Sequence, residues 1–266
     1  MSLYTNQSWQ SPSQSNIFRQ GITKPFTQYE YHRMDLDRQD VENKLNKYHK
    51  KIPGTTQVSL VLNSGMGAFS LIMATIQEKM TSDNAYICVG KQSYFEIKGY
   101  FQENNAIKST FVDEKNIEKI IDHVIDEDCT AINLDVITNT FKGKVVDFHK
   151  LFSKLNRFKR SNPLYLLIDT TLMGPDFQCS DFLKDNKWPP YLHVILYRSL
   201  QKFDQFGDDM VSGGTLTVIS TDKQHILPLN KYRAILGVNC PEQNLKSFCL
   251  DQKITSNRLG RINRNG

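Results

Sequence analysis

Short apolar runs alternate with helix-like patterns along most of the chain. The runs are rich in apolar and β-branched residues, as buried strands are. They predict strands at residues 57–62, 85–90, 109–113, 129–135, 164–169, 192–198 and 214–220. Between them, apolar residues recur every three or four positions, which is the period of an amphipathic helix. This period predicts helices at residues 66–80, 93–105, 114–126 and 145–158. Such alternation predicts an α/β fold of three α/β/α layers with a mostly parallel sheet.

The two ends of the chain have different patterns. Residues 1–28 are rich in Ser, Gln and Asn, and lack the basic and apolar regions of a secretory signal, so we expect a flexible arm. Val41, Leu45 and Tyr48 lie at helical spacing behind Asp37, a predicted N-cap. From about residue 222 onward the pattern is helical. We therefore expect an arm at 1–28, an N-terminal segment at 29–56, a large domain at 57–240 and a helical segment at 241–266.

Composition excludes several classes of function. The chain has 266 residues, of which 39% are hydrophobic and 23% charged, as in soluble globular proteins. No apolar run approaches the ~20 residues that span a bilayer. The net charge of +5 is spread along the chain without a reader motif, so we expect neither nucleic acid nor membrane as a partner. The five scattered cysteines favour a reducing cytoplasm and no metal site.

Polar residues at the ends of predicted strands are the candidates for chemistry, because ligands of open α/β sheets bind there. Asn63-Ser64-Gly65-Met66-Gly67 joins a strand to the N-terminus of a helix. The free N–H groups and the dipole of such a terminus suit a phosphate, although many such turns are only tight corners.

Two charged residues follow other apolar strands. Asp169 is either a solvated loop residue or N-cap, or the counter-ion of a positively charged group such as a protonated ring nitrogen. Lys202 is either an exposed turn lysine or a nucleophile, and a nucleophilic lysine must reach a pocket that favours its neutral amine. Their occurrence in one order with the phosphate turn favours the functional interpretation.

The order and local sequence of these elements resemble the fold-type I pyridoxal-phosphate enzymes. Within them, the chain resembles the Cys/Met-metabolism family, which includes cystathionine synthases and lyases and methionine γ-lyase. The resemblance is carried by Tyr29–Arg33, Ser64-Gly65-Met66, Tyr94, Leu134–Asn139, Ile168–Thr171, Ser199–Lys202 and Asp209–Gly213. It extends over almost the whole chain after the arm.

The resemblance implies pyridoxal 5'-phosphate as cofactor and assigns the residues that hold it. It places Ser64, Gly65, Met66 and Ser199 at the phosphate, Asn139 at the phenolic oxygen, Asp169 at the ring nitrogen, Thr171 near the ring, Tyr94 stacked on the ring and Lys202 in the Schiff base. Lys202 and Tyr94 would be the catalytic residues. Tyr31 and Arg33 would reach the neighbouring subunit's phosphate, which implies a homodimer or homotetramer.

The implied activity is β- or γ-elimination or replacement on a sulfur-containing or related amino acid. The sequence also departs from the family: Asp135 and Ile137 replace Glu and Pro, Gln201 replaces Thr, Ser212 replaces Gly, and the glycines after Tyr94 are absent. The pattern stops where the small C-terminal domain, which holds the substrate carboxylate, should begin. That domain could reside in a separate chain or in a further part of a longer protein, the chain could be a divergent enzyme, or it could be a degenerate binding or scaffolding subunit. An unrelated domain that binds a nucleotide phosphate at Gly65 is a further alternative.

Overall fold

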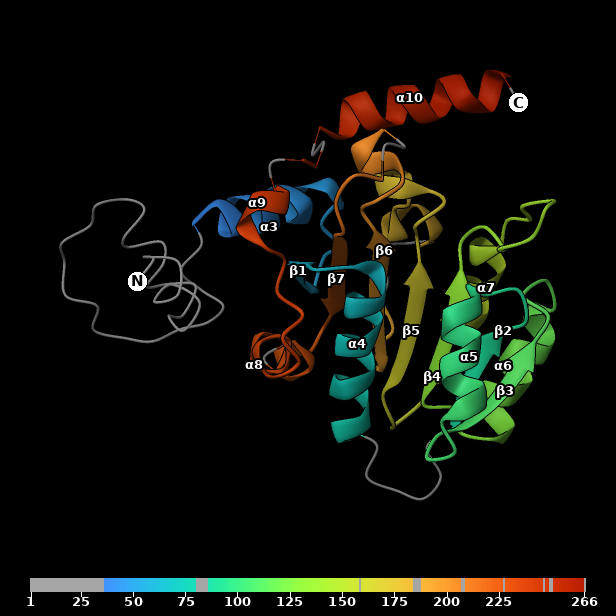
Figure 1. The fold of residues 1–266 in the computed structure, drawn as a ribbon. Coiled ribbons are helices and arrows are strands. Elements are labelled where there is room, and N and C mark those ends of the chain that lie inside the picture. Colours follow the sequence, from blue (N-terminus) through green and yellow to red (C-terminus); the bar gives the residue numbers. More distant parts are fainter. Residues whose placement is uncertain are drawn as a thin grey trace.

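The computed structural model describes residues 36–79, 86–157, 159–183, 188–206, 209–226, 228–245, 247–248 and 251–265. Within these residues, seven strands form one sheet in the order β1-β7-β6-β5-β4-β2-β3 (Figure 1). The strands are β1 (Thr56–Leu62), β2 (Tyr86–Gly90), β3 (Lys108–Val112), β4 (Ala131–Asp135), β5 (Leu164–Asp169), β6 (Leu192–Ser199) and β7 (Gly214–Ser220). Neighbours from β3 to β6 run parallel, and β7 is antiparallel to both β6 and β1. The predicted, mostly parallel sheet is therefore confirmed.

Helices cover both faces of this sheet. The helices of the described residues are α3 (Leu36–Tyr48), α4 (Gly65–Lys79), α5 (Phe95–Glu103), α6 (Ile117–Asp126), α7 (Phe148–Leu155), α8 (Leu229–Ile235), α9 (Glu242–Leu245) and α10 (Gln252–Asn265). Along β5, Leu164, Leu166 and Ile168 belong to the same apolar cluster as α6 and α7. The alternate residues Tyr165 and Leu167 pack with α4, α5 and α8. Side chains of a strand alternate between its faces, so the two clusters are the two interfaces of a three-layer fold.

Several predicted helices have different bounds in the structure. The helix predicted from residue 145 begins at Phe148, because Val145 pairs with Ile137 in a β-bridge and Asp147 caps the helix. Helix α3 begins at Leu36, so Asp37 lies in its first turn and is not the N-cap. The helical pattern after residue 222 is broken into a 3-10 turn and three helices. Pro228 and Pro241 precede α8 and α9, since proline favours a helix start and interrupts a helix interior.

Other expectations concern helix faces and membrane spans. The apolar face of α4, which includes Leu71, Ile72, Met73 and Ile76, is buried against the sheet as predicted. In the described residues, no helix has the length and apolar character to cross a membrane. The cysteines Cys88, Cys129, Cys179 and Cys240 are buried and form no disulfide among the described residues, whereas Cys249 lies outside them.

Candidate active site

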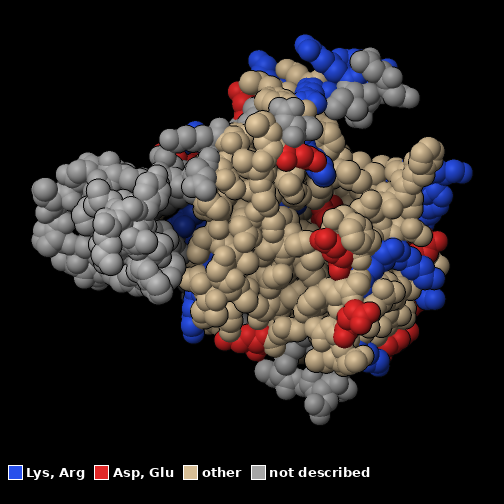
Figure 2. Space-filling model, viewed as in Figure 1, with Lys and Arg blue, Asp and Glu red and all other residues tan. Residues whose placement is uncertain are grey.

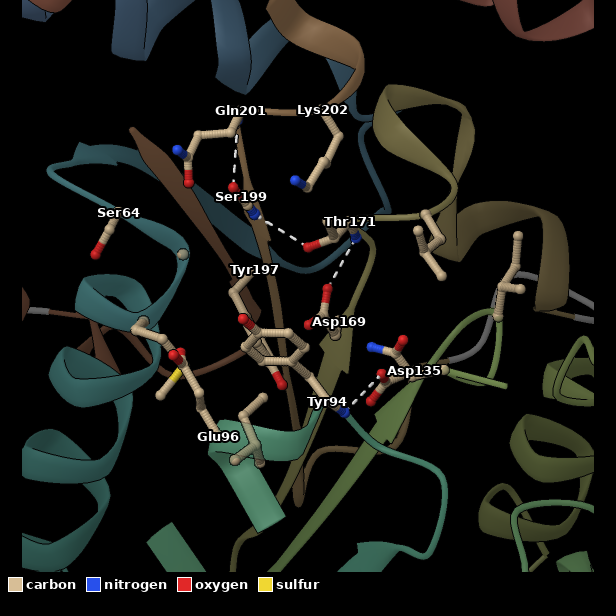
Figure 3. Close-up of a pocket in the computed structure, with 16 residues that line it drawn as sticks. Ser64, Tyr94, Glu96, Asp135, Asp169, Thr171, Tyr197, Ser199, Gln201 and Lys202 are labelled. Atoms are coloured by element: carbon tan, nitrogen blue, oxygen red, sulfur yellow. Dashed lines mark hydrogen bonds between the residues drawn. The ribbon is translucent and has the colours of Figure 1, made fainter. Parts of the chain in front are cut away.

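A cavity of about 430 Å³ opens at the carboxyl ends of the central strands, where β4, β5, β6 and the start of α4 meet (Figure 3). Every predicted cofactor residue that the structure describes lines it. These residues are Ser64, Gly65, Met66, Tyr94, Asn139, Asp169, Thr171, Ser199 and Lys202. Tyr31 and Arg33 lie outside the described residues, so their predicted role stays a prediction. The same cavity also takes in Glu96, Ile97, Leu172 and Tyr197, which sequence reasoning missed.

Ser64 and Gly65 form a tight turn into α4. The Ser64 hydroxyl oxygen accepts a hydrogen bond from the Gly67 N–H at 2.8 Å. A Cβ on Gly214 would lie 2.1 Å from the Ser64 carbonyl oxygen, and a Cβ on Gly65 would lie 3.1 Å from Ser199. The turn thus needs glycines for its close contact with β6 and β7. It brings the positive end of the α4 dipole to the cavity, which favours an anion there.

Hydrogen bonds connect the ends of β5 and β6 across the cavity wall. The Thr171 N–H donates to Asp169 Oδ1 at 2.8 Å, and the Ser199 N–H donates to Thr171 Oγ1 at 3.0 Å. The Ser199 hydroxyl oxygen accepts from the Gln201 N–H at 3.2 Å (Figure 3). This series of hydrogen bonds fixes the Asp169 carboxyl group at one end of the cavity relative to the α4 turn at the other end.

Two carboxyl groups lie side by side in the cavity wall. Asp135 ends β4 and is the register partner of Asp169, which ends β5. Burial raises the pKa of Asp169, although its hydrogen bonds to Thr171 oppose the shift. Burial, and then the charge of Asp169, raise the pKa of Asp135 well above its usual range.

Tyr94 stands at the entrance to α5, and its ring projects into the cavity (Figure 3). Its backbone N–H donates to Asp135 Oδ2 at 3.2 Å, which fixes the start of the helix. Burial and the nearby Glu96 carboxylate raise the pKa of the Tyr94 phenol, and the Lys202 amine opposes this shift. The phenol is therefore neutral at physiological pH and can donate a hydrogen bond.

Lys202 projects from the turn that follows β6, and about half of its side chain is exposed. Its amine lies 2.9 Å from Asp209 Oδ2. An ion pair with this exposure is weak, so a ligand in the cavity can compete for the amine. Figure 3 shows the amine turned toward Ser199 and Thr171. Lys202 thus lines the pocket and is also half exposed, and its role as a nucleophile stays a prediction.

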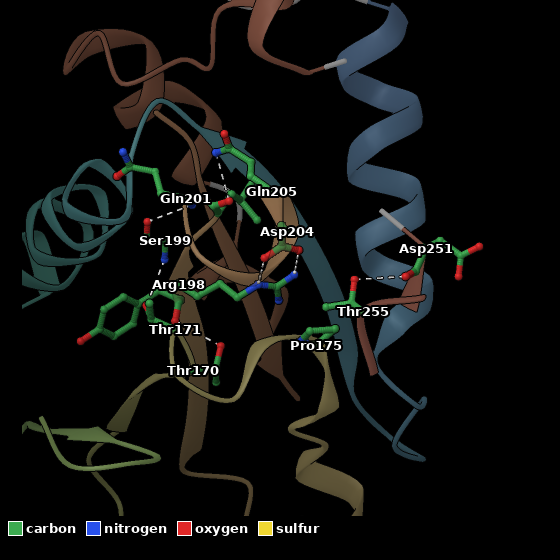
Figure 4. A network of polar contacts seen from close by, with 12 residues as sticks. Thr170, Thr171, Pro175, Arg198, Ser199, Gln201, Asp204, Gln205, Asp251 and Thr255 are labelled. Atoms are coloured by element: carbon green, nitrogen blue, oxygen red, sulfur yellow. Dashed lines mark hydrogen bonds and ion pairs between the residues drawn. The ribbon is translucent and has the colours of Figure 1, made fainter. Parts of the chain in front are cut away.

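Buried polar contacts hold the Lys202 turn in place (Figure 4). The Arg198 guanidinium donates to both carboxylate oxygens of Asp204, at 3.0 and 3.3 Å, and both side chains are almost fully buried. The Gln205 amide donates to the carbonyl oxygens of Leu200 and Val211. The turn is therefore tied to the end of β6 and to the segment that precedes β7.

A signal for some of the missed residues was present in the sequence. Tyr197 lies two positions before Ser199 on β6, so the two side chains share one face of the sheet. Glu96 follows Tyr94 at the same spacing, but it lies in the first turn of α5, where a spacing of two does not place side chains on one face. Only the structure places Glu96 at the cavity.

A second cavity of about 430 Å³ lies beside the first, across the 138–144 loop. Four lysines line it, namely Lys91, Lys115, Lys142 and Lys144. Figure 2 shows basic side chains gathered on this side of the molecule. None of the residues predicted to hold the cofactor lines this cavity.

Sequence comparison identifies no relative of this chain. No family profile matches it, and no curated protein matches it. Comparison of structures does find similar folds.

Solved structures with this fold include three enzymes. Cystathionine gamma synthase from Xanthomonas oryzae pv. oryzae, in complex with aminoacrylate and cysteine, has a TM-score of 0.61 and 14% identity over 84% of this chain and 53% of its own. Cystathione gamma lyase CalE6 from Micromonospora echinospora has a TM-score of 0.62 and 16% identity over 85% and 54%. O-Acetylhomoserine sulfhydrylase from Wolinella succinogenes has a TM-score of 0.57 and 18% identity over 79% and 60%. The chain thus spans a little more than half the length of these enzymes, and it shares their fold.

Proposed function

We propose that this chain binds pyridoxal 5'-phosphate in the cavity at the strand ends and acts on an amino acid, by β- or γ-elimination or replacement. The observation that supports this proposal is that one cavity collects the α4 turn, the Asp169 carboxyl, the Tyr94 ring and the Lys202 amine. These groups come from segments that are far apart in the sequence. Solved structures with this fold include a cystathionine synthase, a cystathionine lyase and a sulfhydrylase.

The charges around the cavity fit this cofactor. The α4 turn and the Ser199 hydroxyl form the side that suits a phosphate. On another wall, the Asp169 carboxyl has no cationic partner among the described residues, and a protonated ring nitrogen would supply one. Asn139 also lines the cavity, where its amide could donate to the phenolic oxygen of the ring.

The residues of this chain would have distinct tasks in the reaction. When bound, the cofactor supplies an electron sink for a carbanion at the α-carbon of the substrate. The Lys202 amine would hold the cofactor through its aldehyde group and would take up and return the α-proton of the substrate. The Tyr94 ring would pack on the ring of the cofactor and hold a proton at its phenolic oxygen. Met66, Ile97 and Leu172 add apolar surface that limits water in the cavity.

The holder of the substrate carboxylate is not among the residues described around the cavity. Lys202 is the one cation that lines the cavity in the described part of the chain. We propose that the cation that holds the carboxylate comes from outside these residues, either from a further part of a longer chain or from a separate chain, and that the protein is a homodimer or homotetramer. The buried thiols of Cys88 and Cys129 support a reducing compartment such as the cytoplasm.

A degenerate binding or scaffolding subunit is the second candidate. The Lys202–Asp209 ion pair favours it, because the pair engages the amine that would otherwise bond to the cofactor. Turnover of sulfur-containing amino acids by cofactor-loaded protein would distinguish the enzyme from this alternative.

Absorbance titration with pyridoxal phosphate tests the proposal. We expect a new visible or near-ultraviolet band in the wild-type protein and in Lys91→Ala, whose lysine lies in the neighbouring cavity. Lys202→Ala should lack this band. A band of equal size in Lys202→Ala would contradict the assignment, and a wild-type band without turnover would favour the scaffolding subunit.

A further inference from the structure

Asp135 is a second carboxyl group beside the proposed ring-nitrogen site, and the proposed function leaves it without a task. It ends β4 opposite Asp169 in the register of the parallel pair, and both residues line the cavity (Figure 3). Register partners on neighbouring parallel strands lie about 4.8 Å apart in their backbones and point to the same face. The two carboxyl groups are therefore close neighbours.

Asp135 is also one of the most enclosed charged residues of the described chain. Its side chain is 4% exposed, and its Oδ1 atom is shielded from solvent without a hydrogen-bond partner. Its Oδ2 atom accepts one hydrogen bond, from the Tyr94 N–H. An ionised carboxylate with an unpartnered, buried oxygen carries a large desolvation cost, whereas a protonated one carries much less.

No cation in the described residues compensates for either carboxylate. The nearest candidate on the cavity wall is Lys202, and its amine is paired with Asp209. The other titratable groups that act on the pair are Glu114 before α6, Tyr94 at the N-cap of α5 and Tyr197 on β6. All three are acidic groups, so none of them offsets the repulsion. Two neighbouring carboxylates without a cation do not both ionise at neutral pH.

The local contacts decide which carboxyl group keeps the proton. Asp169 Oδ1 accepts from the Thr171 N–H, which stabilises its ionised form. Asp135 Oδ2 accepts a longer bond, at 3.2 Å, and although the Ser93 hydroxyl also favours the ionised form, Oδ1 is buried without a hydrogen-bond partner. The proton therefore belongs on Asp135, while Asp169 keeps its charge.

We propose that Asp135 is a proton-holding partner of Asp169. In cofactor-free protein, Asp135 keeps one proton. Loss of that proton strengthens the binding of a protonated ring nitrogen by Asp169. In this step the O–H bond of Asp135 breaks, its electron pair stays on the oxygen, and the proton passes to a water molecule. The pocket then carries a second negative charge next to the positive ring. The binding half of this inference rests on the proposed function, and the half that concerns the empty pocket does not.

The first arm of the test uses cofactor-free protein and the isosteric variant Asp135→Asn. The folded-state pKa of Asp135 lies above the unfolded-state value of 3.8, so folding retains a proton that unfolding releases. A rise in pH therefore favours unfolding of the wild type relative to the variant. In urea unfolding, we expect the unfolding constant of the wild type, divided by that of Asp135→Asn, to rise with pH by up to about tenfold per pH unit. This ratio should level off above the folded-state pKa of Asp135.

The control and the contrary result are defined in the same experiment. Asp122→Asn changes an exposed aspartate on α6 and should leave the ratio to wild type independent of pH. A ratio for Asp135→Asn that is equally flat from pH 4 to 8 would overturn the proposal. If Asp135→Asn does not fold, Asp169→Asn is used in its place. Removal of the neighbouring charge should shift the pH dependence of the unfolding constant toward lower pH. An unchanged pH dependence would overturn the proposal.

The second arm measures binding of pyridoxine 5'-phosphate, which has the ring and the phosphate but no aldehyde. The affinity of the wild type relative to Asp135→Asn should increase as the pH rises through the Asp135 pKa. A constant relative affinity would contradict the binding half of the proposal. If the wild type binds neither this compound nor pyridoxal phosphate, the proposed function fails, and the first arm still decides whether the carboxyl pair holds a proton.

Discussion

Removal of the Asp204 charge should destabilise the protein strongly, because Asp204 neutralises the buried Arg198. The two side chains are 2% and 3% exposed, and Nη2 lies 3.0 Å from Oδ1. At that distance the attraction is ~5.5 kcal/mol for an effective dielectric constant of ~20. Substitution of one partner leaves a buried charge without compensation, which typically costs about 3–5 kcal/mol. We expect Asp204→Asn to lie in this range, a large part of the ~5–15 kcal/mol stability of an ordinary domain.

Urea unfolding followed by circular dichroism measures this cost. The control is Asp181→Asn, because Asp181 pairs with Lys50 at a similar 2.9 Å but both side chains are at least half exposed. That variant should lose only ~0–1 kcal/mol. The double variant Arg198→Met/Asp204→Leu should recover most of the stability, since it removes both charges. Equal losses in Asp204→Asn and Asp181→Asn would refute the reasoning.

Three further predictions follow from the fold and the proposed site. Burial, with the Arg198 charge, lowers the pKa of His49 from 6.5 to about 4. Unfolding therefore takes up a proton, and the protein should lose stability as the pH falls through this interval. Acid titration of the stability of wild type and His49→Gln should show this loss in the wild type only. Gly214→Ala places a Cβ against backbone and should weaken cofactor binding and stability, whereas Gly99→Ala, in an open helical position, should stabilise the protein slightly; calorimetry compares the two. If Arg33 acts across a dimer, mixing Arg33→Ala with Lys202→Ala protein should restore up to about a quarter of the wild-type cofactor sites, because each mixed dimer has one intact site. Cofactor titration of the mixture should show no restoration if the sites are formed within one chain.

The fold could be predicted because each strand is a compact apolar run between polar turns. Runs such as 164–169 leave little choice but a buried strand, and strand–helix alternation then limits the topology. The helix ends were less predictable, since a bridge from Val145 to Ile137 competes with the helical pattern there. Pro228 and Pro241 were visible signals for the breaks between the C-terminal helices.

The candidate site was predictable in part because parallel strands deliver their carboxyl ends to one edge of a sheet. This rule brings Asp169, Asn139 and Ser199 together without any knowledge of side-chain contacts. The partnership of Asp135 with Asp169 depends on strand register, which a sequence does not display. The ion pair of Lys202 with Asp209 depends on a turn whose shape is fixed by buried contacts in the structure. Such pairs of side chains can be identified only in the three-dimensional structure.

Borohydride reduction of protein mixed with pyridoxal phosphate tests the central claim most directly. Peptide mass spectrometry then locates the stable adduct among the lysines of the chain. The account predicts one dominant adduct, on Lys202, that forms at a low molar excess of cofactor. Folded protein that carries no adduct on Lys202, or carries it only at the level of exposed lysines such as Lys91, would contradict the account.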